Sequence, residues 1–138
     1  MEDFVPYELA VKLKEKGFRE KCFARYSFYA GTLKYNEIDV DKRPSAYKLT
    51  IKEFGGCYNL YMYNDIDAPT ISQVLKWLRE KKNIFVVTFI ADDSDAPLTY
   101  EIYMGTECLL THHGEYFTLQ EWDKCNLVGI EYVLDNLI

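Results

Sequence analysis

Four residues that could bind a metal ion or take part in catalysis lie within eight positions of one another: Cys108, His112, His113 and Glu115. Zinc sites pair such ligands at short fixed spacings and take a second pair from elsewhere in the chain. This sequence offers no such second pair, and two adjacent histidines seldom point to one ion. We therefore expect a loop at residues 112–115, with no metal and no cofactor.

The same thiol and imidazole do not predict covalent catalysis. A nucleophilic cysteine needs a depressed pKa and a neighbouring imidazole, whereas Cys108 precedes Leu109 and Leu110 and is expected to be buried. No two carboxylates stand in an apolar context that would raise the pKa of one of them for acid–base work. The sequence therefore disfavours an enzyme and indicates no catalytic residue.

Three aspartates, Asp92, Asp93 and Asp95, crowd four positions. A calcium-binding EF-hand loop needs acidic ligands at positions 1, 3 and 5, glycine at position 6 and glutamate at position 12. The spacing here differs, and Pro97 interrupts it. The segment is typical of a solvated turn.

Aromatic residues make up 16% of the chain. Tyrosine suits interfaces because its ring is apolar while its hydroxyl binds water or a partner. Tyr61 and Tyr63 share one face of an expected strand, and Trp77 lies beside the apolar stripe of an expected helix. These three residues are candidate interaction anchors. The alternative, which burial statistics favour, is that most tyrosines pack in the core with their hydroxyls in water.

Charge is distributed unevenly along a chain whose net charge is −6. Residues 1–56 carry a balance of +2, residues 57–83 a balance of +1, and residues 84–138 a balance of −9, since Lys124 is the only base there. Phosphate binding relies on Lys and Arg. The sequence therefore argues against a nucleic-acid-binding face on its C-terminal part. An acidic side suits a basic partner, or simply keeps the chain in solution.

Length, hydropathy and cysteine usage are those of a soluble globular protein. The 138 residues suit one domain spanning residues 1–138. The longest apolar run, residues 84–91, is far shorter than the roughly 20 residues of a membrane span, and the sequence does not open with a secretory signal. We expect reduced thiols in a cytoplasmic protein, because no C-x-x-C pairing links the cysteines: Cys22, Cys57, Cys108 and Cys125.

Three helices are expected. The first spans residues 6–16 with a glycine cap at Gly17; the second begins at Pro69 and Thr70 and closes at Asn83; the third runs from Thr118 to the chain end. Capping-box spacing marks the second and third starts. Gly129, which costs about 1 kcal/mol inside a helix, indicates close packing against a strand. The inward positions expected on the second helix are Ile71, Val74, Leu75 and Leu78, and on the third Trp122, Cys125, Gly129, Val133 and Leu137.

The segments between the helices alternate in hydropathy or are continuously apolar, as strands do. Gly55-Gly56 predicts a tight hairpin, and residues 84–90 predict a central strand covered on both faces. Strands are expected at residues 22–29, 32–35, 47–54, 57–63, 84–90, 98–104 and 108–111. The fold class is therefore α+β, a mainly antiparallel sheet of about five to seven strands, built from hairpins, with three helices packed against it.

Three segments carry a resemblance to a known group of proteins. They are APTISQVLKWLREK at residues 68–81, the pair YELA and LKEKGF at residues 7–10 and 13–18, and GIEYVL at residues 129–134. With these segments the chain resembles small uncharacterised proteins of gut Bacteroides genomes, prophages and mobile elements. The resemblance implies a bacterial or phage cytosolic setting. It implies no reaction, because no activity is established for that group.

The function that these observations favour is a small, non-enzymatic binding or protein-interaction protein of a bacterial or phage accessory genome, acting by contact with a protein partner or by self-association. The alternative is an acidic decoy, a nucleic-acid mimic that occupies a basic host or phage protein. A small enzyme ranks lowest. Salt separates the first two, because a charge-driven complex weakens steeply as salt rises.

Overall fold

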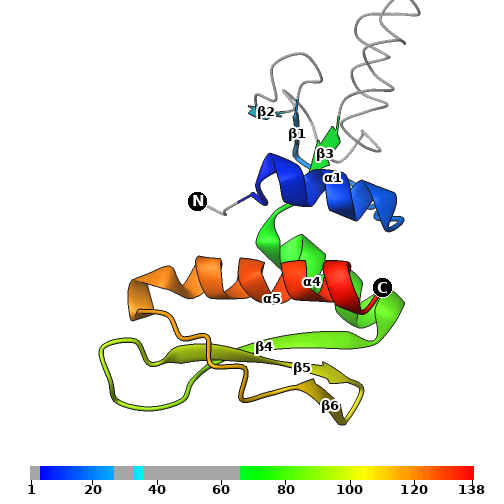
Figure 1. The fold of residues 1–138 in the computed structure, drawn as a ribbon. Helices are drawn as coiled ribbons and strands as arrows, with labels where there is room; N and C mark the ends of the chain where they lie inside the picture. Colours follow the sequence, from blue (N-terminus) through cyan, green and yellow to red (C-terminus); the bar gives the residue numbers. More distant parts are fainter. Residues whose placement is uncertain (1–3, 27–32, 36–65) are drawn as a thin grey trace, which may run out of the picture. The chain divides into compact units, whose positions relative to one another are not determined.

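The computed structural model describes residues 4–26, 33–35 and 66–138 (Figure 1). The chain divides into two compact units, residues 2–70 and residues 71–138, which we call the N-terminal unit and the C-terminal unit. The single domain over residues 1–138 that the length predicts stays a prediction. No helix in the described ranges is both long enough and apolar enough to cross a membrane.

The fold class is α+β, as the sequence predicts. Three α-helices and two three-stranded antiparallel sheets make up the described residues, with strand orders β2-β1-β3 and β4-β5-β6. The sequence analysis placed all the strands in one sheet. The described strands instead pair within their own unit, so each unit has a sheet of its own.

In the N-terminal unit, helix α1 (Tyr7–Glu15) forms where the sequence predicts it. Pro6 is extended and precedes the first turn, and Gly17 adopts a positive φ of 94° that ends the helix. The Phe18 N–H then bonds the Leu13 carbonyl at 2.9 Å. The expected apolar face is confirmed, since these residues are buried: Leu9, Ala10, Leu13 and Phe18.

The N-terminal sheet pairs β1 (Ala24–Tyr26) with β2 (Leu33–Tyr35) on one side and β3 (Ile66–Ala68) on the other. The Tyr26 hydroxyl donates to the Val5 carbonyl at 2.5 Å, and its ring meets that of Tyr7 edge to face. The expected hairpin at Gly55-Gly56 lies outside the described residues.

In the C-terminal unit, β5 (Leu98–Met104) is the middle strand between β4 (Ile84–Ile90) and β6 (Glu107–Leu110). The prediction that residues 84–90 form a central strand covered on both faces is therefore wrong. Every residue of this unit is described, and β4 pairs there with β5 alone. Its apolar run leaves Val87 41% and Ile90 63% exposed.

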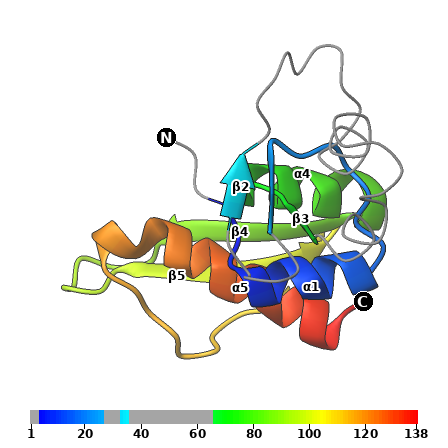
Figure 2. The ribbon, with the colours of Figure 1, turned by 90° about the horizontal axis from the view of Figure 1, so that it is seen from above.

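Helices α4 (Ile71–Lys82) and α5 (Trp122–Asn136) lie on the same face of this sheet (Figures 1 and 2). A Cβ at Gly129 would stand 2.6 Å from Val86 Cγ1, which confirms close packing of α5 on the sheet. The inward stripes need three corrections. Leu75 is only half-buried, Leu137 is half-buried and follows the last residue of α5, and Trp122, in the first turn of α5, is 46% exposed.

A capping box of Thr118 and Glu121 is present, as the sequence predicts, at the start of the helical segment that leads into α5. A short 3-10 turn, η3 (Leu119–Glu121), leads into the helix, and the Glu121 carboxylate accepts the Thr118 N–H at 2.9 Å. This bond, with that from Lys124, lowers the pKa of Glu121. The expected acidic turn is also present: Asp92 accepts the N–H and the hydroxyl of Ser94.

Candidate functional site

Within the C-terminal unit, both helices lie on one face of the sheet, and no helix of the unit lies on the other face. The covered face is fixed by Gly129, which packs on Val86 and Tyr100, and by the Thr88 hydroxyl, which donates to Asn126 of α5 at 2.7 Å. Side chains alternate along a strand, so the intervening residues point to the other side. We call that side the open face; its members on β4 and β5 are Phe85, Val87, Phe89, Thr99, Glu101 and Tyr103.

The open face is mainly aromatic and apolar. Phe85 and Phe89 are half-buried, Val87 is exposed, and Tyr103 stands opposite Phe85 in the register. Both helices of the unit lie on the other side of the sheet, so neither of them covers these side chains (Figure 1). An uncovered group of large apolar residues on a small unit is typical of a contact surface.

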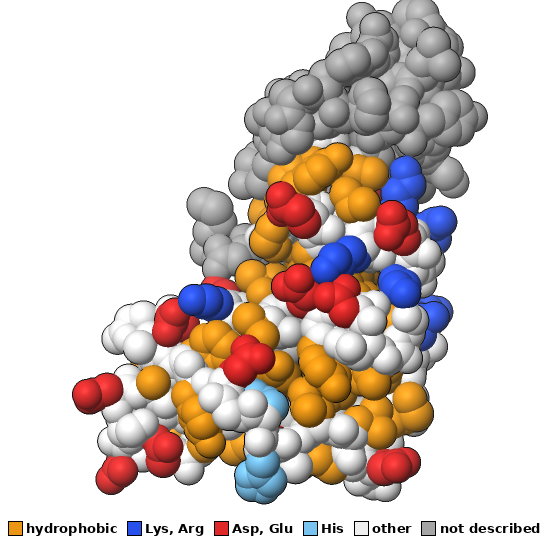
Figure 3. All heavy atoms as spheres, viewed as in Figure 1, with side chains coloured by type: hydrophobic (Ala, Val, Ile, Leu, Met, Phe, Trp, Pro, Cys, Tyr) orange, Lys and Arg blue, Asp and Glu red, His pale blue; other side chains and the backbone are white. Residues whose placement is uncertain are grey.

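Acidic groups accompany this apolar surface. Glu101 projects from the middle of the open face, opposite Val87, and accepts a weak hydrogen bond from the Cys108 thiol at 3.8 Å. Partial burial, followed by the nearby Glu101 and Cys108, raises the pKa of Tyr103. Figure 3 shows one side of the molecule, where acidic side chains are interspersed with hydrophobic ones in the lower part, which Figure 1 assigns to the C-terminal unit.

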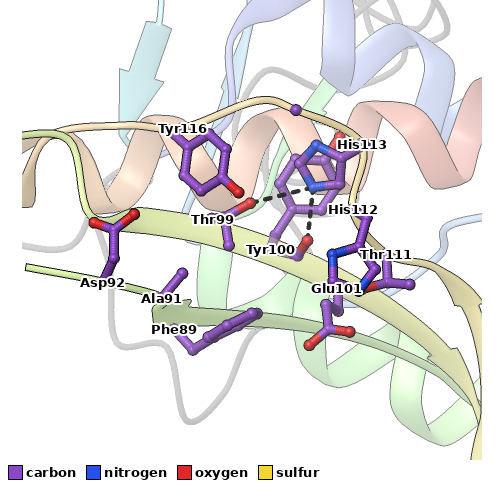
Figure 4. Close-up of a pocket in the computed structure, with 11 residues that line it drawn as sticks. Phe89, Ala91, Asp92, Thr99, Tyr100, Glu101, Thr111, His112, His113 and Tyr116 are labelled. Atoms are coloured by element: carbon purple, nitrogen blue, oxygen red, sulfur yellow. Dashed lines mark hydrogen bonds between the residues drawn. The ribbon is translucent and has the colours of Figure 1, made fainter. Parts of the chain in front are cut away.

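A pocket of about 400 Å³ adjoins the open face where β6 ends (Figure 4). Two positive φ angles, 52° at His112 and 84° at Gly114, turn the chain away from β5 after β6. It returns at Phe117, which exchanges two backbone hydrogen bonds with Leu98. The arch of residues 111–116 forms one wall of the pocket, and Phe89 and Ala91 line the opposite side.

The His113 ring lies between the edge of β5 and the arch of residues 111–116 and forms hydrogen bonds to both. Its Nε2 lies 2.7 Å from the Tyr100 carbonyl and its Nδ1 lies 3.1 Å from the Glu115 N–H. Nδ1 must therefore accept and Nε2 must donate, which fixes the neutral Nε2–H tautomer. The ring also stacks on Tyr100, with centroids 4.1 Å apart. Since both nitrogens are engaged, His113 acts as a structural part of the wall rather than as a base or a ligand.

The charged groups of the pocket are carboxylates. Asp92 and Glu101 lie toward opposite ends of it (Figure 4). The hydrogen bonds from Ser94, first through its hydroxyl and then through its N–H, lower the pKa of Asp92, so this carboxylate stays ionised. Among the described residues that line the pocket there is no Lys or Arg. Two carboxylates around the Phe89 ring suit a cation rather than an anion.

No protein-family model, curated protein or solved structure matches this chain. The structure alone therefore locates the candidate site. In the described part of the chain, no three His, Cys, Asp or Glu side chains gather where they could hold a metal ion.

The candidate residues of the sequence analysis have different outcomes. Cys108 is exposed, so its expected burial is wrong, whereas Cys22 and Cys125 are buried as expected. Burial, then Asp67 and Glu20, raise the pKa of Cys22. Cys57 lies outside the described residues.

Of the three candidate anchors, Tyr61 and Tyr63 also lie outside the described residues. Trp77 is only 5% exposed, with the Lys82 ammonium 5.5 Å from the ring centroid. A ring this enclosed packs in the interior, and its burial gives no support to an anchor role. The open face was missed because residues 84–90 are apolar at every position but Thr88. From such a uniform pattern one cannot predict which alternate side chains of the strand lie under a helix.

Proposed function

We propose that this chain is a non-enzymatic binding protein that contacts a basic protein partner through the open face of its C-terminal sheet. The observation that carries the proposal is the group formed by Phe85, Val87, Phe89 and Tyr103, which no helix of the unit covers. Half-buried aromatic side chains around the exposed Val87 supply the apolar centre that a protein interface needs.

Charge supports a basic partner. Residues 84–138 hold ten acids against Lys124 alone, and Glu101 stands within the open face itself. The pocket beside the face, with Asp92 and Glu101 in its lining, suits a Lys or Arg side chain that extends from the partner's apolar contact. A bacterial or phage accessory genome remains the setting that the sequence resemblance predicts.

The acidic decoy is the second candidate, and the same acids favour it. The two proposals differ in what supplies the affinity. A decoy binds through many dispersed charges, so salt weakens it steeply. Binding centred on the open face depends on a few apolar side chains and survives salt.

The test is a selection of random displayed peptides on the immobilised protein, followed by binding to two variants. Val87→Asp places a charge on the open face, and Leu119→Asp is the matched control because Leu119 is 54% exposed on η3. We expect peptides that combine Lys or Arg with apolar residues and that bind the control but not Val87→Asp. Purely basic peptides that bind both variants and are released by salt would favour the decoy, and the absence of any enrichment would refute the proposal.

A further inference from the structure

The outer edge of β4 is a strand edge with its hydrogen-bonding groups unused in the C-terminal unit. The Gly105 N–H bonds the Asn83 carbonyl at 3.0 Å, and the Ala91 N–H bonds the Pro97 carbonyl at 2.8 Å. Bonding partners alternate along an antiparallel ladder, so the odd-numbered residues of β4 bond to β5. The even-numbered ones direct their N–H and C=O groups away from β5. Of these, Val86, Thr88 and Ile90 are at least partly exposed, whereas Ile84 is fully buried.

The edge of β4 lacks the features that prevent an exposed strand from pairing with another strand. Proteins protect exposed edges with proline, inward-pointing charges, bulges or very short strands. β4 is seven residues long, contains no proline, glycine or charge, and pairs with β5 without a register shift. An apolar strand with these properties is a template for another strand.

The charges beyond the two ends of β4 indicate which strand would pair with its free edge. Lys81 and Lys82 precede the strand, and Asp92 and Asp93 follow it. A second β4 that runs antiparallel to the first sets the basic end of each copy beside the acidic end of the other, whereas a parallel arrangement brings like charges together. Charge therefore favours self-pairing about a two-fold axis, which is also the commonest symmetry of soluble oligomers.

We propose that β4 pairs antiparallel with β4 of a second copy, so that the two C-terminal sheets join into one continuous sheet. An axis at Thr88 pairs Val86 with Ile90 and Thr88 with Thr88 of the second copy, and leaves the buried Ile84 out of the contact. These are even-numbered residues in both chains, so outward N–H groups meet outward carbonyls, with about six new hydrogen bonds. The open faces of the two copies then lie on the same side of the joined sheet, because a two-fold axis perpendicular to the sheet keeps each face on its own side.

The first test removes the outward hydrogen bond at the end of the strand. Ile90→Pro deletes an N–H that β5 does not use, and Ile90→Ala is the matched control because it keeps the N–H and loses similar apolar area. In sedimentation equilibrium at tens of micromolar protein, we expect a dimer for the wild type and for Ile90→Ala, and a monomer for Ile90→Pro. Circular dichroism checks that the proline variant is folded.

The second test exchanges charges at the strand ends. Lys81 and Asp93 are exposed, and the side chain of neither forms an ion pair or hydrogen bond with the described residues. Lys81→Glu and Asp93→Lys should each weaken their own dimer by roughly fivefold, since each puts like charges at both ends. An equimolar mixture restores opposite charges at both ends and should form a mixed dimer of wild-type affinity.

A monomeric wild type overturns the proposal, and so does a dimer that persists in Ile90→Pro. The proposal is also overturned if the mixture of Lys81→Glu and Asp93→Lys dimerises no more tightly than either variant alone. These outcomes are independent of the proposed function. The experiment contains no partner, and none of the substituted residues belongs to the open face.

Discussion

The two faces of the C-terminal sheet come from the same strands but differ in what they meet. On the covered face, Ile102 and Tyr100 are at most 1% exposed, and α5 approaches so closely that Gly129 has no room for a side chain. On the open face, one position further along each strand, Val87 is 41% exposed and Glu101 stands opposite it. The alternation of side chains along β4 and β5 therefore does not show which face is interior, because the residues of the covered face and those of the open face are both rich in apolar types. The face that no helix of the C-terminal unit covers is where a further molecule can bury most apolar surface by binding.

Truncation should distinguish the two faces by the largest margin. Ile102→Ala removes a fully buried side chain from the middle strand and should lower the free energy of unfolding by about 2–5 kcal/mol, through lost burial and the cavity left behind. Val87→Ala on the open face should cost about 0.5 kcal/mol. Urea denaturation of both variants measures the difference, and equal losses would mean that the open face is as enclosed as the covered one.

A larger side chain on the covered face should lower the stability of the protein. Gly129→Leu forces atoms into a space where even a Cβ stands 2.6 Å from Val86, and the change should destabilise the protein by about 3 kcal/mol. The control is Gln120→Leu, at an exposed position of η3. A melting temperature unchanged in both variants would show that α5 does not rest on Val86.

Two thiols report on the two faces separately. Cys108 is exposed beside Tyr103 on the open face, whereas Cys125 is buried and its pKa is raised by that burial. A thiol reagent should therefore label Cys108 faster than Cys125 by about two orders of magnitude, because Cys108 is exposed whereas Cys125 is buried and its raised pKa keeps it protonated. Mass spectrometry of partly labelled protein gives both rates in one sample, and preferential labelling of Cys125 would reverse the assignment of the faces.

The smallest expected effect concerns Glu121, in the capping box that precedes α5. The folded pKa of Glu121 is lowered, so its contribution to stability is present above the usual value of 4.5 and is lost as pH falls through the folded value. Glu121→Gln should remove that part of the acid dependence. The difference between the unfolding midpoints of wild type and variant should shrink below about pH 4.5; a constant difference would contradict the capping role.

Local signals in the sequence were sufficient for the elements that build the covered face. Thr118 with Glu121 marked the start of the last helix, and Gly129 marked its approach to a strand, because each motif depends on neighbours in sequence or on its own lack of a side chain. The helix at Ile71–Lys82 followed from its apolar period in the same way.

The open face and its pocket could not be predicted, because they depend on register and backbone conformation. A register shift between Ile102 and Tyr103 puts Cys108 on the side of Tyr103, although the two leucines after it suggest burial. The pocket exists because His112 adopts a positive φ, which few residues other than glycine do. Nothing in the sequence marks that conformation, or the bond from His113 to the Tyr100 carbonyl.

The most direct test of the account measures the affinity of a selected basic-apolar peptide for wild type, Val87→Asp and Leu119→Asp by calorimetry at low and high salt. If the open face is the contact surface, Val87→Asp binds at least about tenfold more weakly, a loss of about 1.4 kcal/mol. Leu119→Asp should then stay within about twofold of wild type, and high salt should leave most of the wild-type affinity. Equal affinity for all three proteins, with binding abolished at high salt, would contradict the account and assign the contact to the dispersed acidic charge.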